Sequence, residues 1–238
     1  MAAPAPPSTA AAKSPETATP GVRVLAISDE VEQLIYSDRV RERFAHVDLV
    51  LSCGDLPTYY LEYIVSSLNV PLYGVRGNHD YGASFDGIPT GSLGPGTGDL
   101  HRQVVHLNGL IIAGLEGSMA YNHGPHQYSE LGMRYQISRI VPRLLLNKLR
   151  YGRYLDILIT HAPPRGIHDR PDRCHTGFEA FRSFIRRFRP RYHLHGHIHV
   201  YDRQTTVRTQ VDDTIVQNVY GYKELRIPPF AGDQTAAK

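Results

Sequence analysis

From residue 22 onward, short apolar runs alternate with segments of helical periodicity. The runs at 22–28, 48–53, 71–76 and 155–160 each have the length and apolar character of a buried strand. Helical periodicity separates them at 39–46 and 59–68. Each of these strands ends in polar residues. The pattern predicts an α/β sheet whose strand ends carry the polar chemistry.

Other segments have the alternation of antiparallel strands. Residues 101–107 and 110–116 flank Asn108-Gly109, a pair that favours a tight hairpin turn. We also expect strands at 191–200, 205–211 and 214–219, the last two joined by a turn at Asp212-Asp213. Helices are expected at 133–151, interrupted or kinked by Pro142, and at 177–188. The sum is one domain with a mixed sheet arrangement, which we place at 21–230.

The two ends of the chain and one internal segment differ from this pattern. Residues 1–20 are mostly Ala, Pro, Ser and Thr, so we expect a disordered tail there and a shorter one at 231–238. The Gly-rich segment 81–99 is expected to be a mobile loop. No apolar run approaches the roughly 18 to 20 residues that cross a bilayer, and no secretory signal is visible. We therefore expect a cytoplasmic protein without a membrane partner.

Composition and charge bear on whether the chain folds and on what kind of partner it binds. With 41% hydrophobic and 21% charged residues among 238, disorder throughout the chain is excluded. The net charge of +3 hides an asymmetry, because 134–203 holds fifteen Lys or Arg against five acids. Such a basic region can attract nucleic acid or a small phosphorylated substrate, or is simply a solvated basic surface. The arginines of 182–191 lack interleaved aromatic residues, which makes nucleic acid the less favoured partner.

Five strand ends carry side chains that bind metals. They are Asp29, Asp55, Asn78 with His79, His161, and the pair His197 and His199. Carboxylate and amide oxygens mixed with imidazoles suit Mn²⁺, Fe or Zn²⁺, and one carboxylate can bridge two ions. A single Asp at a strand end is more often a helix cap, but five such ends in succession are not explained by capping. Neither Cys53 nor Cys174 has the spacing of a disulfide framework or a thiolate zinc site.

In this order and spacing the motifs resemble those of the calcineurin-like metallophosphoesterases. Gly54-Asp55, Gly77-Asn78-His79-Asp80, His161 and Gly196-His197-Ile198-His199 match the family's pattern over about 22–219. The resemblance implies a four-layer α/β/β/α sandwich with two central mixed sheets. It also implies a dinuclear metal site between the strand ends.

The same resemblance implies a role for each matching residue. Asp55 would bridge both metals, Asn78, His161 and His197 would complete one site, and Asp29 and His199 would serve the other. His79 would not bind metal but would stabilise the substrate phosphate or protonate the leaving group. Asp80 would orient His79, or simply pair with Arg76.

One position departs from the family's pattern. The first motif requires His two residues after Asp29, and this chain has Val31. Either water or a side chain such as Glu32 or Tyr36 fills the gap, or the site binds weakly, or only the second metal is bound. We expect two metals with one held more loosely.

These features predict a metal-dependent phosphoesterase that acts on a phosphodiester or nucleotide-like molecule through metal-activated hydroxide. The alternative is a phosphate- or nucleotide-binding protein with vestigial catalysis. His168, His175 and Arg165 are candidate substrate contacts, whereas His193 and His195 are expected to be satisfied core histidines. The segment 117–126 forms either a cap over the site or a plain surface loop. Substrate identity, metal identity and oligomeric state do not follow from the motifs.

Overall fold

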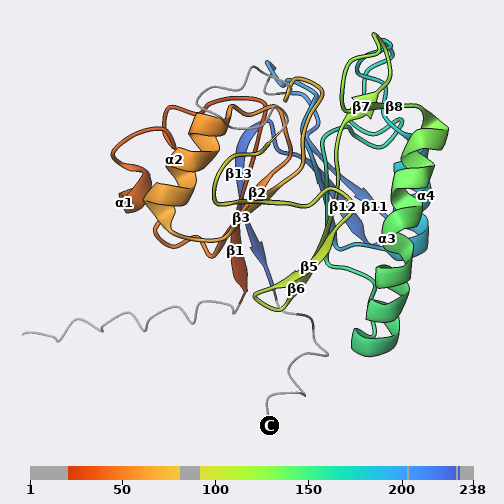
Figure 1. Cartoon of the computed structure of the whole chain (residues 1–238), viewed down its shortest axis with the longest axis horizontal. Helices are drawn as coiled ribbons and strands as arrows, with labels where there is room; N and C mark the ends of the chain where they lie inside the picture. Colours follow the sequence, from red (N-terminus) through yellow and green to blue (C-terminus); the bar gives the residue numbers. More distant parts are fainter. Residues whose placement is uncertain (1–20, 81–91, 203, 229, 231–238) are drawn as a thin grey trace, which may run out of the picture.

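Two mixed β-sheets pack face to face, with helices on both outer sides (Figure 1). The computed structural model describes residues 21–80, 92–202, 204–228 and 230. The tails expected at 1–20 and 231–238 lie outside these residues, as does the expected loop from 81 to 91. The order of helix, sheet, sheet and helix confirms the four-layer α/β/β/α arrangement.

The first sheet has five strands in the order β13-β1-β2-β3-β4. All neighbouring pairs are parallel except β1 with β13. Two helices, α1 and α2, cover its outer face (Figure 1). The elements are β1 (Val22–Ser28), α1 (Val40–Phe44), β2 (Leu49–Ser52), α2 (Thr58–Leu68), β3 (Leu72–Gly74), β4 (Thr97–Asp99) and β13 (Gly221–Ile227).

The second sheet has six strands in the order β11-β12-β10-β9-β6-β5. Its central strands are parallel, whereas the hairpins β5-β6 and β11-β12 are antiparallel. The long helix α3 and the shorter α4 cover it (Figure 1). The elements are β5 (Val104–Leu107), β6 (Leu110–Leu115), α3 (Glu130–Tyr151), β9 (Ile157–Thr160), α4 (Glu179–Phe188), β10 (Tyr192–His195), β11 (Arg208–Val211) and β12 (Thr214–Asn218).

Three apolar clusters hold the four layers together. The cluster between the sheets joins residues such as Ala26 and Leu51 to Ile112 and Ile159. A second packs α1 and α2 on the first sheet, and a third packs α3 and α4 on the second sheet. Strands β1, β2, β6 and β9 each contribute to two of these clusters through their alternating side chains, so these central strands are apolar on both faces.

Several elements differ from the sequence expectations. Strand β13 was not expected, because Lys223, Glu224 and Arg226 interrupt its apolar pattern, yet all seven residues pair with β1. Strand β4 lies inside the expected loop at 81–99 and pairs with β3. Of the two effects expected of Pro142, the interruption is wrong: α3 continues through Pro142, which is exposed. The strand expected at 191–200 ends at His195, and Gly196 begins a loop.

The segment after β6 forms a small parallel pair, β7 (Ser118–Met119) and β8 (Gln127–Tyr128). It is anchored by Glu116, whose carboxylate accepts from the Tyr128 hydroxyl at 2.6 Å and pairs with Arg76 at 2.9 Å. The loop between β7 and β8 thereby rises above the strand ends (Figure 1). Among the described residues, no helix has both the length and the apolar character needed to cross a membrane.

Candidate metal centre

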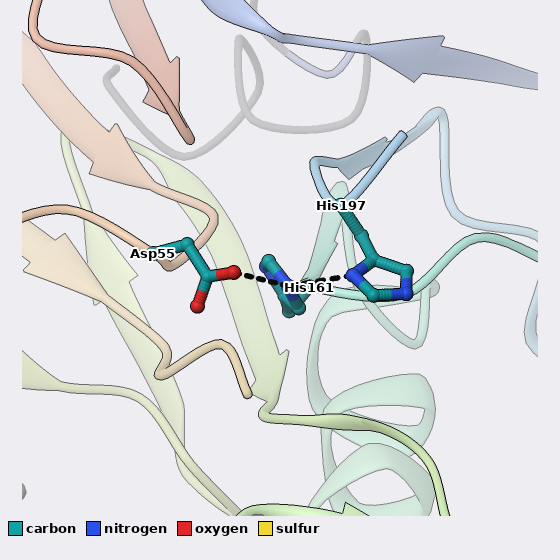
Figure 2. Close-up of side chains that lie close together, drawn as sticks. All are labelled: Asp55, His161 and His197. Carbon is teal, nitrogen blue, oxygen red and sulfur yellow. Dashed lines mark hydrogen bonds and ion pairs between the residues drawn. The ribbon is translucent and has the colours of Figure 1, made fainter. Parts of the chain in front are cut away.

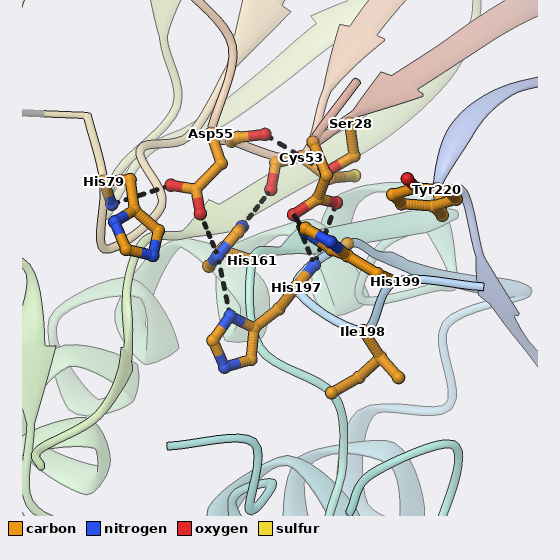
Figure 3. Close-up of polar contacts among 12 residues, drawn as sticks. Ser28, Cys53, Asp55, His79, His161, His197, Ile198, His199 and Tyr220 are labelled. Atoms are coloured by element: carbon orange, nitrogen blue, oxygen red, sulfur yellow. Dashed lines mark hydrogen bonds and ion pairs between the residues drawn. The ribbon is translucent and has the colours of Figure 1, made fainter. Parts of the chain in front are cut away.

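The polar residues at the strand ends of both sheets meet at one edge of the sandwich (Figure 3). Asp29 and Asp55 follow β1 and β2, and His161 and His197 follow β9 and β10. Asp29, Asp55 and His197 have positive φ angles of 65°, 55° and 67°. This backbone conformation is costly for residues other than glycine, and such strain is found preferentially at functional sites. It turns the three side chains out of the strand direction into the space between the sheets.

The centre of the site is His161, which is fully buried (Figure 2). Its Nε2 lies 3.2 Å from an oxygen of Asp55, 3.1 Å from Asn78 Oδ1 and 3.1 Å from His197 Nδ1. Its Nδ1 donates to the carbonyl of Cys53 at 2.8 Å, so in the neutral ring Nε2 carries the lone pair. Four electron-pair donors therefore converge on one small volume.

The second imidazole is oriented in the same way. His197 Nε2 donates to the carbonyl of Cys174 at 2.7 Å, which leaves the Nδ1 lone pair facing His161. A backbone carbonyl thus selects the tautomer of each ring, as is common for metal-binding histidines. Converging lone pairs repel one another unless a proton or a cation lies between them. The donor set of Asp55, Asn78, His161 and His197 therefore fits a divalent cation of the Mn, Fe or Zn kind.

The charges of the site are strongly coupled. Burial alone would lower the pKa of His161, but the charge of Asp55 outweighs it and raises that pKa to about 9. Burial would likewise raise the pKa of Asp55, but His161 outweighs it and lowers that pKa to about 2. Without a cation, Asp55 and His161 therefore form a buried ion pair. A metal that binds here takes the place of the proton on His161.

The other half of the site contains Asp29 and His199. Both oxygens of Asp29 accept from the backbone N–H of His197, at 3.0 and 2.9 Å. His199 Nε2 lies 3.8 Å from Asp29 Oδ1, while its Nδ1 contacts the Tyr201 hydroxyl at 2.9 Å. Burial raises the pKa of Asp29 to about 6. This half presents fewer donors than the half around His161 and is more open, because the His199 side chain is 42% exposed.

The structure shows what surrounds the position of the missing histidine. Val31 packs on the apolar cluster beneath α1 and α2. Glu32 lies against Gly221, and the ring of Tyr36 packs on Tyr63 with centroids 4.7 Å apart. Neither contact belongs to the Asp29–His199 pair. The ring of Tyr220 lies beside His199, with 4.9 Å between centroids (Figure 3).

Close packing of the loops depends on glycine at two positions. A Cβ on Gly196 would overlap the side chains of Ser28 and Asp29. A Cβ on Gly77 would overlap Asp55 and crowd the ring of His161. Only glycine lets these two loops approach the carboxylates this closely, which explains physically why Gly precedes Asn78 and His197.

His79 and Asp80 occupy different environments. The His79 side chain is exposed, and its backbone N–H donates to Asp55 Oδ1 at 2.8 Å (Figure 3). Asp80 was expected to orient His79 or to pair with Arg76. In the structure its Oδ2 accepts from the backbone N–H groups of Asp55, at 2.8 Å, and Gly77, at 2.7 Å. Asp80 therefore holds together the two loops that carry Asp55 and Asn78.

Of the residues expected as substrate contacts, His175 lies close to the candidate metal ligands, whereas His168 is engaged elsewhere in the protein. His168 was expected to line the cleft, but its Nδ1 contacts His195 at 3.0 Å and its Nε2 contacts Thr209 at 2.9 Å, so both nitrogens are engaged inside the protein. His193 and His195 are fully buried. The ring of His175 lies 5.2 Å from that of His197, close to the centre. The backbone of Arg165 bonds to Phe178 and Arg182, and its side chain is exposed.

Several residues of the site were not found from the sequence. The carbonyls of Cys53 and Cys174 carry no sequence signal, because every residue has a carbonyl. Tyr121, in the segment expected as a cap or loop, accepts from Asn78 Nδ2 at 3.1 Å and so directs Asn78 Oδ1 toward His161. Arg170 donates to the carbonyl of His199 at 2.8 Å. In the sequence, only the position of Arg170 within the basic region 134–203 indicated that it could lie near the site.

A second group of potential ligands lies in the loop above His197. Asp172, Cys174 and His175 bring one carboxylate oxygen, one thiol and one ring nitrogen within 4.8 Å of one another. Burial and the neighbouring carboxylate of Asp172 raise the pKa of the Cys174 thiol. The group lies within one exposed turn, in which the backbone N–H of His175 donates to Asp172 at 3.1 Å.

Comparisons with known proteins agree with this fold. The model of the calcineurin-like phosphoesterase family matches residues 22–201. The crystal structure of TT1561 of Thermus thermophilus is similar, with a TM-score of 0.55 and 13% identity over 87% of this chain and 99% of that chain. Another solved chain has a TM-score of 0.57 and 19% identity over 87% and 95%. At these identities the likeness shows the fold alone. A search of curated proteins finds no match.

Proposed function

The chain belongs to the calcineurin-like phosphoesterase family, and from this membership and the geometry of its site we propose that it hydrolyses a phosphodiester or nucleotide-like phosphate ester. The observation that carries the proposal is the convergence of Asp55, Asn78, His161 and His197, with both imidazoles oriented by backbone carbonyls. A site that only bound phosphate would need positive charge and N–H donors. This site offers lone pairs, which bind cations.

We propose two divalent cations, of Mn, Fe or Zn, as cofactors. Asp55, Asn78, His161 and His197 would hold one, and Asp29, His199 and Asp55 would hold the other. Bound divalent cations supply an activated water and neutralise the charge on phosphoryl oxygens. Because Val31 removes one donor, we expect the second ion to be held more loosely.

The protein's own groups would do the rest of the chemistry. His79 stands at the exposed side of Asp55, where it would stabilise the phosphate or protonate the leaving oxygen. Asp80 and the carbonyls of Cys53 and Cys174 fix the orientation of the ligands before substrate arrives. No covalent intermediate with the enzyme is needed.

The residues at the rim of the site support the proposal of a substrate ester that carries an aromatic or nucleoside group. The ring of Tyr201 is 79% exposed and lies beside His199, with centroids 5.9 Å apart. Exposed aromatic rings at such a position bind bases by stacking. Arg170, also exposed, adds positive charge beside His199. These two residues suit a phosphodiester that carries a planar group.

One observation favours a second candidate function. The Asp29–His199 half lacks the imidazole that Val31 replaces, and a protein that retained only the other half could bind a phosphate or nucleotide without turning it over. Retention of His79 at the open side of the site favours the enzyme.

The test uses metal-stripped protein with bis(p-nitrophenyl) phosphate and p-nitrophenyl phosphate, with and without added Mn²⁺. Asp55→Asn should abolish turnover and bound metal together, because both half-sites use this carboxylate. His79→Ala should slow turnover while metal content stays unchanged. Equal metal loss in both variants would contradict this division of roles. Absence of turnover by the wild-type protein with metals bound would favour the binding protein.

A further inference from the structure

The solvent side of α3 is unusually apolar. Of the nine large hydrophobic side chains exposed in the described part of the chain, six lie on this helix. Leu149 is 86% exposed and Leu131 is 78% exposed. The residues that form what we call the apolar crest of α3 are Leu131, Tyr135, Leu145, Leu146 and Leu149.

The crest is continuous along the helix. Its members follow one another at helical spacings of three and four, with Ser138 and Pro142 between Tyr135 and Leu145, so they share one face. The buried residues Met133, Ile140 and Leu144 occupy the opposite face. Since α3 has 22 residues, the crest extends over about 33 Å at most. The helix therefore has two apolar faces, of which only one is covered by the protein.

After Glu130, the exposed charged side chains that flank the crest on α3 are all basic. Between Leu131 and Leu155 there are six basic residues and no acid. Five of the six are exposed; the sixth, Arg153, is buried and pairs with Asp156. Glu130, at the start of α3, is already paired with Arg134 at 3.3 Å. The exposed basic residues of the rim are Arg134, Arg139, Arg143, Lys148 and Arg150, and the neighbouring α4 adds Arg186 and Arg187.

We infer that the apolar crest and its basic rim dock on an anionic membrane surface. Apolar side chains at the centre of a helix face, flanked by Lys and Arg, are the pattern of helices that lie in the interface of a bilayer. The helix forms the outermost layer on its side of the molecule, so it can meet a planar surface along its length (Figure 1). The expectation of no membrane partner rested on the lack of a spanning segment, which does not bear on surface docking.

The charge of the rim also argues against a second copy of the chain as the partner that covers the crest. Two crests packed on each other would bring two predominantly basic rims together, and the acids beside them, Glu130 and Glu179, already pair with Arg134 and Arg186. An anionic lipid surface neutralises every rim residue at once. The inference does not depend on the proposed phosphoesterase activity, because the crest lies on the outer face of the second sheet's helices, away from the strand ends.

The test is co-sedimentation of the full chain with phosphatidylcholine vesicles, with and without phosphatidylserine. We expect binding to the phosphatidylserine vesicles that weakens as salt is added. Each rim cation near such a surface contributes about fivefold to partitioning. The double variant Arg139→Glu with Arg150→Glu should therefore lower the partition constant by at least about 25-fold. Leu145→Gln with Leu149→Gln should lower it by at least about tenfold.

Matched controls come from the opposite outer layer. Tyr59→Gln in α2 removes a side chain that is 54% exposed, and Arg39→Glu with Arg43→Glu reverses two exposed charges, one at the N-cap of α1 and one within it. Both controls should bind vesicles like the wild type, and thermal melting should show all variants folded. Gln retains good helix propensity at the crest positions.

Three results would overturn the inference. The first is no binding to phosphatidylserine vesicles at low salt. The second is unchanged binding by the leucine variant, which would reduce the interaction to charge alone. The third is a dimer in sedimentation velocity that the leucine variant abolishes, which would make the crest an interface between copies of the chain.

Discussion

The sharpest prediction concerns Asp80, whose carboxylate joins the two loops that carry Asp55 and Asn78. One oxygen, Oδ2, accepts from the backbone N–H groups of both Asp55 and Gly77. Burial and the charge of Asp55 raise the pKa of Asp80, so the negative charge itself is unfavourable at this place. The geometry indicates that the oxygen is needed as an acceptor and that the charge is not. Asp80→Asn and Asp80→Ala separate these two properties.

The expected magnitudes follow from the two hydrogen bonds. Each buried N–H left without a partner costs about 1–3 kcal/mol, so Asp80→Ala could lose about 2–6 kcal/mol of the free energy of unfolding. Because Asp80 is half-buried rather than fully enclosed, we expect the lower part of this range, about 2–3 kcal/mol. Asparagine keeps one oxygen that can accept both bonds, so Asp80→Asn should cost less than about 1 kcal/mol. Loss of ligand orientation should weaken metal binding by Asp80→Ala about 10- to 100-fold.

Urea unfolding of the metal-free proteins measures the first effect, and competition for Mn²⁺ with a chelating dye measures the second. Asp202→Ala is the control, because this exposed carboxylate accepts one loop N–H, from Gln204, and its loss should stay within about 0.5 kcal/mol. If Asp80→Ala matches the wild type in both measurements, Asp80 does not hold the ligand loops. If Asp80→Asn is as damaging as Asp80→Ala, the charge rather than the acceptor is what matters.

Three further predictions address packing, pH and ligand orientation. Gly196→Ala should lower the free energy of unfolding by about 1–3 kcal/mol and reduce turnover, because its Cβ would overlap Asp29; unchanged urea unfolding and activity would contradict the packing argument. Burial lowers the pKa of His193 to about 3, whereas the unfolded chain titrates near 6.5, so stability should fall as pH drops below about 6.5, by up to about 1.4 kcal/mol per pH unit from this group. Urea unfolding at pH 7 and pH 5.5 checks this: His193→Gln should reduce the difference, and the remainder comes from buried groups such as His195 and His197, whose pKa values burial also lowers. Tyr121→Phe should weaken Mn²⁺ binding by about tenfold while thermal stability is preserved, since Asn78 loses the hydroxyl that fixes its amide; equal affinity by chelator competition would show that the amide needs no such support.

The elements that the sequence predicts well are those with local signals. Buried strands such as β1 and β9 are continuous apolar runs, and the Asn108-Gly109 turn has the positive φ angles, 50° and 78°, that this pair favours. Strand β13 lacks such a signal, because an edge strand carries charges and its pairing with β1 joins residues about 200 positions apart.

The same distinction holds within the site. The six proposed ligands stand at strand ends that apolar runs locate, and the structure brings them together at one edge. The engagement of both His168 nitrogens, the acceptor role of Asp80 and the carbonyls behind His161 and His197 depend on loops from distant segments meeting. Sequence can give the residue type at such positions, but hydrogen-bond partners in other loops have no periodic signal.

The two halves of the site differ in how firmly their donor groups are held before a cation binds. This difference predicts which half binds a cation more tightly. Around His161 every donor is held by a further contact, to a carbonyl, a hydroxyl or a backbone N–H, so little ordering remains to be done when a cation binds. Around His199 the donors are fewer: the His199 side chain is 42% exposed and contacts Tyr201, and the buried Asp29 carboxylate already accepts from the backbone of His197. A cation entering there must compete with water and with these contacts. We therefore expect the His161 half to fill first, and the Asp29–His199 half to fill fully only when phosphoryl oxygens of a substrate add the donors that Val31 cannot supply.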